Sequence, residues 1–228
     1  MNPPLAPEII AHLADSYPHN HDYRIREGRL KPSWQLWKRA RKIRKHYSPG
    51  SSSLLDLSSC KGFFLLDAVL RLGMNRTRGI DVHLPDVEAS RAASTFLGLD
   101  DRVQIQQAHL HEIAAEVELG RERPFDTTLL INTYPYLFFG SRREEHHYAS
   151  HAEIFSHLAS LTAKGGHLVF SNRVEVDLCP GHIQERAMEL GLVASYGEEQ
   201  IRAAISVHFE IEQKGKLGKI PLWVLHRR

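Results

Sequence analysis

Residues 53–64 decide the expected fold, and they read Ser53-Leu54-Leu55-Asp56-Leu57-Ser58-Ser59-Cys60-Lys61-Gly62-Phe63-Phe64. The leucines form a short apolar run of the kind that a buried parallel strand needs, and the small and polar residues after them suit a tight loop. Residues 63–72 have helical character, and Gly79-Ile80-Asp81 reads as a second strand. A strand–loop–helix–strand unit forms a crevice at the carboxyl end of its first strand, where free backbone N–H groups can hold an anion.

An acid stands at the end of the second strand. Asp81 lies 19 residues after Gly62, which is close to the spacing at which an acid accepts hydrogen bonds from a ribose in nucleoside-binding proteins. The stretch therefore predicts a nucleoside-cofactor site. The alternative interpretation is an ordinary strand–helix–strand turn of any doubly wound protein.

The loop also resembles that of a known family. The pattern Asp56-x-Ser58-x-Cys60-x-Gly62 is similar to the Asp/Glu-x-Gly-x-Gly-x-Gly loop of class I S-adenosylmethionine (SAM) dependent methyltransferases, and the similarity covers roughly residues 50–228. Ser58 and Cys60 replace the first two glycines, so the backbone approaches a ligand less freely than glycine would allow. The resemblance implies SAM as the cofactor, with a cofactor site made of Asp56, Ser58, Ser59, Cys60, Gly62, Asp81, Val82, His109 and Asn132.

The resemblance implies an α/β fold: a Rossmann-like, doubly wound sheet of mostly parallel strands with a C-terminal antiparallel hairpin, preceded by an N-terminal helical arm. The expected division is a basic arm at residues 1–50 and a methyltransferase domain at 51–228. A terminal hairpin favours this fold over the dinucleotide-binding dehydrogenase fold. Further helices are expected at residues 85–97, 142–161 and 180–190, and further strands at 102–107, 125–131, 167–171, 207–213 and 220–226.

The composition is typical of a soluble globular protein, and the absence of membrane-span and signal-peptide patterns predicts a cytoplasmic location. Charged residues make up 25% and hydrophobic residues 42% of the 228 residues, which gives no sign of disorder. No apolar run reaches the roughly 18 residues of a membrane span, and the N-terminus lacks the order of a signal peptide. Cys60 and Cys179 have no CxxC spacing, so neither a zinc site nor a disulfide framework is expected.

Positive charge is concentrated near the N-terminus, although the formal net charge is only +2. Ten cations stand against the single anion Glu27 in the segment Arg24 to Lys45, which predicts an anionic partner there. Residues 1–22, with four prolines and a short apolar patch, are expected to be a loosely packed leader. The functional interpretations of the basic segment are a lid over the cofactor and a basic surface for nucleic acid, and the structural alternative is a solvated face on a helix packed against the core.

The basic segment contains a predicted helix that begins after Ser33. Trp37, Ala40, Ile43 and Tyr47 recur at spacings of three and four and predict one apolar side. The two aromatic residues are therefore expected to be buried and unable to stack on bases. For this reason a small-molecule acceptor is slightly preferred to RNA.

Two segments at strand ends carry the remaining candidate residues. Where many methyltransferases place an Asp that receives the adenine amino group, this chain has Ala108-His109, and His109 or Gln107 can substitute. Residues 132–136 follow the fourth strand and resemble the family segment that lines the methyl donor. They are not the Asn-Pro-Pro-Tyr of amino-group methyltransferases, and a plain hydrophobic wall is an equal alternative. Asn172 and Arg173 are expected to project at the cofactor side.

Fifteen histidines raise the possibility of a metal site. Of the close sets, His147 and His151 have the i, i+4 spacing that places two ligands on one helical face. No acid or cysteine at metal spacing completes a set, so no metal is expected.

The prediction is a SAM-dependent methyltransferase whose acceptor is a small molecule or RNA. Its main contributions would be alignment of donor and acceptor and electrostatic shaping of the site. Tyr134, His109 and His151 are the candidates for a general base. The competing hypothesis is a non-catalytic module with a decayed donor loop, which binds RNA or protein through the basic arm.

Overall fold

The computed structural model of the chain describes residues 4–17, 21–141 and 146–228. The chain divides into two compact units, Met1–Leu110 and His111–Arg228. The boundary expected at residue 50, between arm and methyltransferase domain, stays a prediction.

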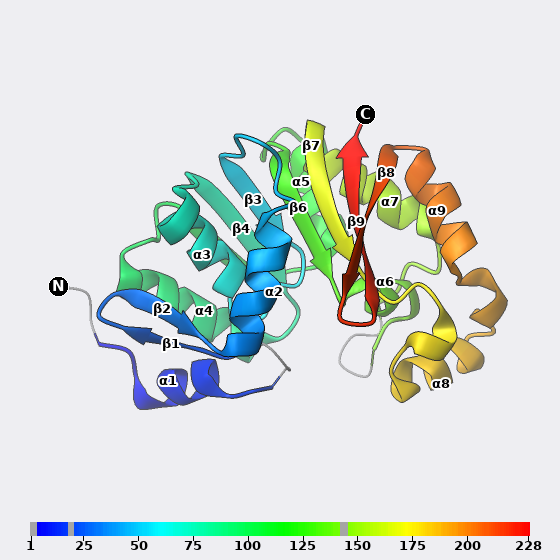
Figure 1. Ribbon diagram of the computed structural model, residues 1–228. Coiled ribbons are helices and arrows are strands. Elements are labelled where there is room, and N and C mark those ends of the chain that lie inside the picture. Colours follow the sequence, from blue (N-terminus) through cyan, green and yellow to red (C-terminus); the bar gives the residue numbers. More distant parts are fainter. Residues whose placement is uncertain (1–3, 18–20, 142–145) are drawn as a thin grey trace. The chain divides into compact units, whose positions relative to one another are not determined.

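The first unit contains three parallel strands in the order β5-β4-β3 (Figure 1). They are β3 (Ser53–Asp56), β4 (Arg76–Asp81) and β5 (Val103–Gln107). Helices α3 (Phe63–Leu72) and α4 (Leu84–Leu97) make the crossovers. All four residues of β3 are buried, as the leucine run predicted. The predicted strand–loop–helix–strand unit is therefore confirmed.

The N-terminal arm contains more regular structure than the sequence predicted. Helix α1 (Pro7–Ala14) packs against α4, and its Leu13 is buried. An antiparallel hairpin of β1 (Tyr23–Arg26) and β2 (Arg29–Pro32) follows. Its two turn residues, Glu27 and Gly28, both have positive φ, as a tight two-residue hairpin turn requires. The sequence analysis missed this hairpin.

Helix α2 (Trp34–Arg44) begins where predicted, since the Ser33 hydroxyl accepts the N–H of Leu36 at 3.3 Å. Its buried side differs from the prediction. Leu36 and Ile43 are fully buried, whereas Trp37 is only half-buried and stacks on the exposed Trp34. The expectation that Trp37 lies on the buried side is therefore wrong, because the buried side centres on Leu36.

The second unit contains four strands in the order β6-β7-β9-β8 (Figure 1). Strands β6 (Phe125–Ile131) and β7 (Thr162–Ser171) are parallel. Strands β8 (Phe209–Leu217) and β9 (Ile220–Arg227) form an antiparallel hairpin, and β9 pairs antiparallel with β7. The predicted C-terminal hairpin and the α/β fold of mostly parallel strands are thus confirmed.

The helices of the second unit begin with α5, which spans Leu110–Glu118 and so starts at the boundary between the units. The others are α6 (Tyr134–Phe139), α7 (His151–Leu161), α8 (Gly181–Glu189) and α9 (Glu198–Ser206), with single 3-10 turns at Val176–Leu178 and Val193–Ser195. None of the helices in the described residues combines the length and apolarity that crossing a membrane requires.

Several boundaries in the second unit differ from the sequence predictions, and β8 for example continues to Leu217, beyond the expected end at residue 213. Helix α7 begins at His151, where Ser150 caps it, and not at Arg142; residues 142–145 lie outside the described part of the chain. Gly165 and Gly166 lie inside β7 at a register shift, and are not a turn before it.

Candidate functional site

The loop between β3 and α3 is fixed by its backbone. The N–H of Ser59 donates to the carbonyl of Ile80 at 2.9 Å, and the N–H of Gly62 donates to the carbonyl of Ser59 at 2.8 Å. Gly62 has a φ of +73°, and a Cβ there would stand 3.0 Å from the Ser90 side chain. Cys60 also has a positive φ, 47°, which non-glycine residues rarely adopt. The geometry therefore requires glycine at position 62 and strains position 60.

Asp81 ends β4 and closes the loop against it. Its carboxylate accepts the backbone N–H groups of Cys60 and His83, each at 2.9 Å. Burial raises the pKa of Asp81, although the two N–H bonds act in the opposite direction. Since each carboxylate oxygen can accept a second hydrogen bond, Asp81 keeps acceptor capacity for a ligand.

The other candidates near β4 and β5 differ in exposure. Val82 is exposed, and its carbonyl accepts one N–H of the Gln107 side-chain amide at 3.0 Å, which leaves that amide a second N–H. His109 is half-buried at the end of β5. The adenine assignment of His109 stays a prediction.

Asp56 ends β3 and is buried. One oxygen accepts the N–H of Ser58 at 3.3 Å, and the other has no hydrogen-bond partner among the described residues. Burial raises the pKa of Asp56 to about 7, against the opposing effects of the Ser58 N–H and of Arg39. A buried carboxylate oxygen without a partner is costly, and a cationic group of a ligand would satisfy it.

Arg39, the cation that acts on the pKa of Asp56, is itself hydrogen-bonded to a histidine. Arg39 is buried, and its Nη1 lies 2.7 Å from the His21 Nε2. Burial, helped by Arg39, lowers the pKa of His21 to about 3, so this ring is neutral and accepts the guanidinium hydrogen. Arg39 is thus a structural residue, not part of the exposed basic surface.

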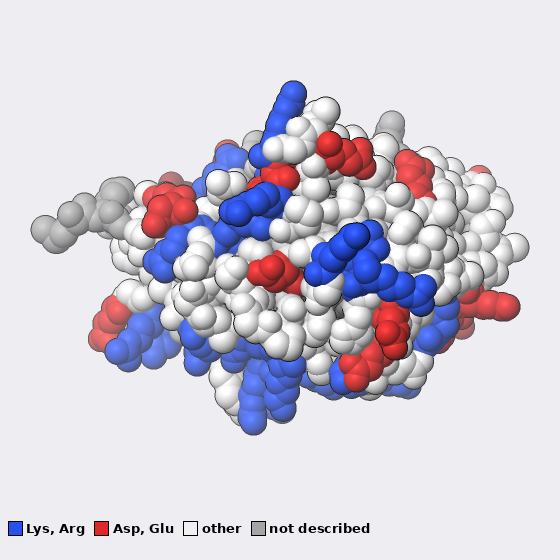
Figure 2. Space-filling model, turned by 90° about the horizontal axis from the view of Figure 1, so that it is seen from above, with Lys and Arg blue, Asp and Glu red and all other residues white. Residues whose placement is uncertain are grey.

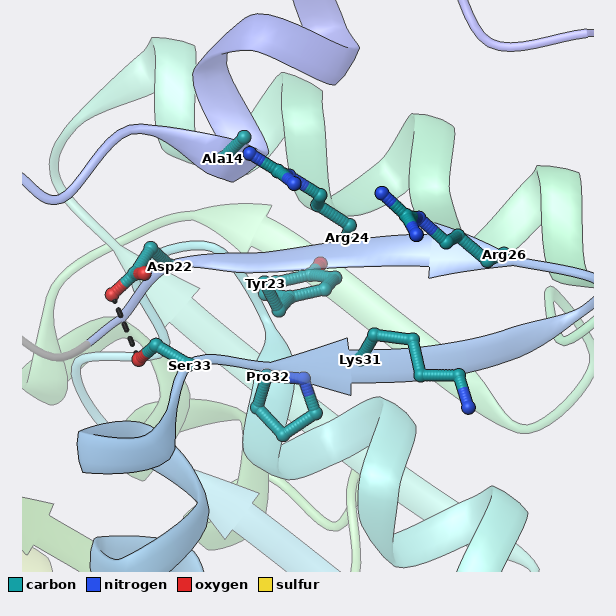
Figure 3. A pocket seen from close by; sticks show the side chains of 8 residues that line it. All are labelled: Ala14, Asp22, Tyr23, Arg24, Arg26, Lys31, Pro32 and Ser33. Atoms are coloured by element: carbon teal, nitrogen blue, oxygen red, sulfur yellow. Dashed lines mark hydrogen bonds between the residues drawn. The ribbon is translucent and has the colours of Figure 1, made fainter.

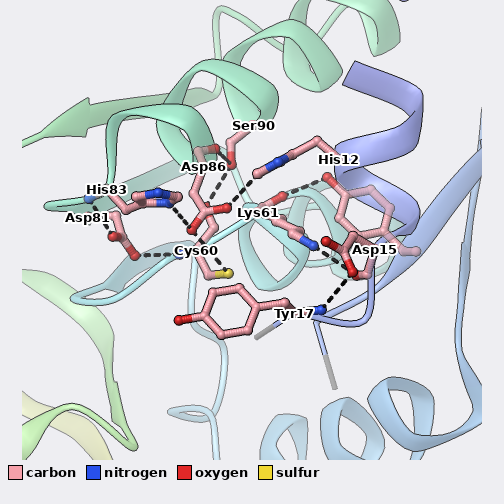
Figure 4. A network of polar contacts seen from close by, with 10 residues as sticks. His12, Asp15, Tyr17, Cys60, Lys61, Asp81, His83, Asp86 and Ser90 are labelled. Atoms are coloured by element: carbon pink, nitrogen blue, oxygen red, sulfur yellow. Dashed lines mark hydrogen bonds and ion pairs between the residues drawn. The ribbon is translucent and has the colours of Figure 1, made fainter. Parts of the chain in front are cut away.

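A carboxylate on α4 joins the arm to the loop (Figure 4). Asp86 is 2.7 Å from the His12 Nε2 and 2.8 Å from the His83 Nδ1. The Cys60 thiol lies 3.8 Å from the same carboxylate, and the Ser90 hydroxyl donates to the Cys60 carbonyl at 2.9 Å. With the Asp81 bond to its N–H, Cys60 is held in its strained conformation by three neighbours.

The next loop residue, Lys61, is also held by the arm. Its side chain is buried, and Nζ donates to the carbonyl of Asp15 at 2.8 Å, while the Tyr23 hydroxyl donates to the Lys61 carbonyl at 2.6 Å. The prediction of a loosely packed leader is therefore wrong. The network of His12, Lys61, His83 and Asp86 was not predicted from the sequence. The available signal was the three-residue spacing of His83 and Asp86 at a helix start.

The buried Tyr134 and the half-buried His151 form a pair in the second unit. The Tyr134 hydroxyl is 2.5 Å from the His151 Nδ1, and the His151 Nε2 is 2.9 Å from the Ser195 carbonyl. The carbonyl can only accept, so Nε2 carries the hydrogen and Nδ1 accepts from the tyrosine. Burial raises the pKa of Tyr134 well above its usual value and lowers that of His151, so both are neutral. The Tyr134 hydroxyl and the His151 Nδ1 are therefore both engaged with each other.

The segment between β6 and α6 is anchored by Asn172. Its Oδ1 accepts the N–H groups of Thr133 and Tyr134 at 2.7 and 2.9 Å. Asn172 is fully buried, so the expectation that it projects at a cofactor side is wrong. Asn132 has a positive φ of 60°, and its Oδ1 is buried without a hydrogen-bond partner among the described residues.

The premise of the histidine metal hypothesis also changes. His147 precedes α7, so it does not share a helical face with His151. In the described residues no group of three His, Cys, Asp or Glu side chains is placed to hold a metal ion.

Neither a family model nor a curated protein matches this sequence. Solved structures do match. An O-methyltransferase family protein from Burkholderia thailandensis shares 16% identity with a TM-score of 0.59, over 84% of this chain and 55% of that one. The N-methyltransferase NodS from Bradyrhizobium japonicum WM9 shares 15% identity with a TM-score of 0.53, over 86% and 97% of the two chains.

A third match is a geranyl diphosphate methyltransferase in complex with GPP and sinefungin, with 10% identity, a TM-score of 0.56, and 84% and 77% coverage. The chain has the fold of the class I methyltransferases. It spans about half the length of the Burkholderia protein. The assignment of the β3–α3 loop as the donor loop stays a prediction.

Within this methyltransferase fold, Tyr134→Phe tests whether the tyrosine is a general base. The variant loses the hydrogen bond to His151, so we expect the unfolding free energy to fall by about 1 kcal/mol, measured by urea denaturation. Tyr196→Phe is the matched control, because that buried hydroxyl also makes one hydrogen bond, to the Arg173 carbonyl at 2.6 Å. Equal losses of stability with transfer retained in both variants would exclude Tyr134 as the base.

Proposed function

We propose that this chain is a SAM-dependent methyltransferase. The observation that carries the proposal is the buried Asp56 carboxylate at the end of β3, one oxygen of which has no partner among the described residues. The methionine end of SAM bears an ammonium group, which would supply the missing partner and offset the cost of burying the charge. The methyltransferase fold of the chain supports this assignment.

The other loop residues fit the remaining parts of SAM. Asp81 keeps lone pairs for ribose hydroxyls, although two backbone N–H groups already bind it. The backbone of residues 58–62 would border the methionine end, and His109 would lie at the adenine. Bound SAM supplies a methyl group on a cationic sulfonium, which an aligned nucleophile can attack. The residues of the chain itself would bind SAM and orient it toward the nucleophile.

Two acceptor classes are candidates. The preference for a small molecule rested on the burial of Trp37 and Tyr47. Tyr47 is buried, but Trp37 is half-buried and stacks on Trp34, which is 63% exposed. The second candidate, RNA, therefore gains the aromatic surface that the sequence argument had denied it.

The competing function is a non-catalytic module that keeps the fold without the cofactor. It is favoured by Ser58 and Cys60 in place of glycines and by the strain at Cys60. Direct calorimetric titration of the folded protein with SAM separates the two. Binding in the micromolar range supports the enzyme, and no binding supports the module.

SAM affinity should depend on pH through Asp56. The carboxyl is protonated below its pKa of about 7 and cannot pair with an ammonium group. We therefore expect affinity to fall by up to tenfold per pH unit below about 7 and to level off above it. Asp56→Asn should bind SAM weakly at every pH. A wild-type affinity that is constant between pH 5 and 8 would contradict this assignment.

The raised pKa of Asp56 should also change how the stability of the protein without SAM depends on pH. Because the folded-state pKa of Asp56 is raised above its ordinary 3.8, the folded state binds more protons between pH 3.8 and about 7. This contribution to stability is complete below pH 3.8 and is lost as pH rises through about 7. Asp56→Asn should not show this fall in stability with rising pH. The comparison of the two proteins without SAM is the control for the SAM titration.

A further inference from the structure

The β1–β2 hairpin carries four cations on one face. Residues directly opposite each other share a face, and Arg24 pairs with Lys31 while Arg26 pairs with Arg29. Because the side chains of a strand alternate, both pairs lie on the same side. All four are exposed. We call this set, Arg24, Arg26, Arg29 and Lys31, the cationic hairpin face.

The opposite face of the hairpin is apolar and packs inward. It is formed by Tyr23, Ile25, Leu30 and Pro32, of which Tyr23 is buried with its hydroxyl bonded to the Lys61 carbonyl. The orientation of the cations is therefore set by the core and by the donor loop. They cannot turn away from solvent without unpacking Tyr23.

Two acids, Asp22 and Glu27, lie near the cationic hairpin face. Among the described residues none of its four members forms an ion pair, and the neighbouring Asp22 is bonded to the Ser33 hydroxyl at 3.0 Å. The acid Glu27 lies in the hairpin turn. Like charges directly opposite each other on a sheet are destabilising, so the face lowers the stability of the free protein. An external anion would relieve this repulsion.

A hollow of about 490 Å³ adjoins this face (Figure 3). It extends from Ala14 at the end of α1 to Ser33 at the start of α2, and Arg24, Arg26 and Lys31 line it. Three cations and the acid Asp22 thus line a concave surface, which keeps a net positive charge and is large enough for an anionic group. More broadly, Figure 2 shows Lys and Arg side chains projecting together along the lower left edge of the molecule.

Helix α2 adds aromatic surface immediately after the hairpin. Trp34 and Trp37 stack with ring centroids 4.8 Å apart. Lys38 lies over the Trp34 ring and Arg41 over the Trp37 ring, at 4.8 and 5.5 Å. Exposed aromatic rings among cations are the combination that stacks bases and neutralises phosphates of single-stranded nucleic acid.

We propose that the cationic hairpin face binds the phosphate backbone of RNA. Alternate residues of a strand are about 7 Å apart, so the two cross-strand pairs suit two successive phosphates better than one isolated anion. The adjoining Trp34 offers a base a stacking partner, which a lone phosphate would not need. The proposal goes beyond the proposed methyl transfer, because it requires no bound SAM.

The test is fluorescence anisotropy with a labelled single-stranded RNA of about 20 nucleotides at rising KCl, beginning at about 50 mM. The variant is the triple change Arg24→Gln, Arg26→Gln and Lys31→Gln. The matched control is Arg121→Gln, Lys164→Gln and Lys219→Gln, which removes the same charge from exposed positions. Both variants are first checked for unchanged circular dichroism.

We expect the hairpin variant to bind RNA at least about tenfold more weakly at the lowest salt. The slope of log affinity against log salt should become less steep by about 2. The control should change the affinity by less than about twofold. Trp34→Ala should lose roughly tenfold. Equal losses in both triple variants would overturn the proposal, because net charge alone would explain them. So would binding of the wild type to phosphatidylserine vesicles without binding to RNA.

SAM titration of the hairpin variant separates this proposal from the proposed function. None of its three changed residues belongs to the candidate cofactor site, so we expect unchanged SAM affinity. Arg39 and Arg44 are left intact, since Arg39 is buried beside His21 and Arg44 donates to Asp67 at 2.6 Å. Loss of RNA binding with SAM binding retained would support the hairpin face directly.

Discussion

Gly62→Val is expected to lower the unfolding free energy by roughly 3 kcal/mol and to abolish SAM binding. The left-handed backbone of residue 62 costs a residue with a Cβ about 1–2 kcal/mol, and forcing atoms into a packed contact costs a further 1–3 kcal/mol. The contact is with Ser90 on α4, 3.0 Å from the new Cβ. The side chain would therefore displace the loop from α4. Urea denaturation and SAM titration measure the two effects.

Gly73→Val is the matched control. Gly73 ends the same helix with nearly the same φ, +70°, but a Cβ there meets nothing within 4 Å. Its unfolding free energy should fall only by the about 1–2 kcal/mol that a Cβ costs at left-handed φ, and its SAM affinity should stay unchanged. If the two variants were equally stable, the Ser90 contact would have no energetic importance. Normal SAM binding by a folded Gly62→Val protein would place the cofactor away from this loop.

The parts of the fold that the sequence predicted well are those with strong local signals. The start and end of α3 follow from the apolar run after Gly62 and the glycine at 73, and β6 follows from Phe125, the two β-branched threonines and the apolar residues 129–131. Most residues of both elements are buried, so the pattern has few alternatives. The β8–β9 hairpin was similarly visible in the alternation on either side of a Lys- and Gly-rich turn.

The arm was predicted poorly because its structure depends on distant partners. The β1–β2 hairpin has a short alternating pattern in which arginines and a lysine fill one face, so charge obscured the strand signal. Lys61 can be buried because its ammonium group donates a hydrogen bond to the carbonyl of Asp15. No local pattern predicts a hydrogen bond between residues so far apart in sequence. Trp37 was misplaced because Leu36 offered an equally good helical stripe.

Asp81→Ala should weaken SAM binding by about 1.5–3 kcal/mol, the range for hydrogen bonds to a charged group, which corresponds to roughly 10- to 150-fold. The structure adds a complication, since the same carboxylate holds the N–H groups of Cys60 and His83. Removing it also loosens the loop, so weaker binding alone would not prove a contact with the ribose.

A ligand lacking the ribose hydroxyls resolves this ambiguity. S-adenosylhomocysteine and its 2′,3′-dideoxy form are titrated into the wild type and into Asp81→Ala, which completes a double-mutant cycle between the side chain and the hydroxyls. If Asp81 accepts from the ribose, the dideoxy form binds the wild type at least about tenfold more weakly, while Asp81→Ala binds both forms alike. Additive losses would show that Asp81 acts only by holding Cys60 and His83, and the ribose assignment would then be withdrawn.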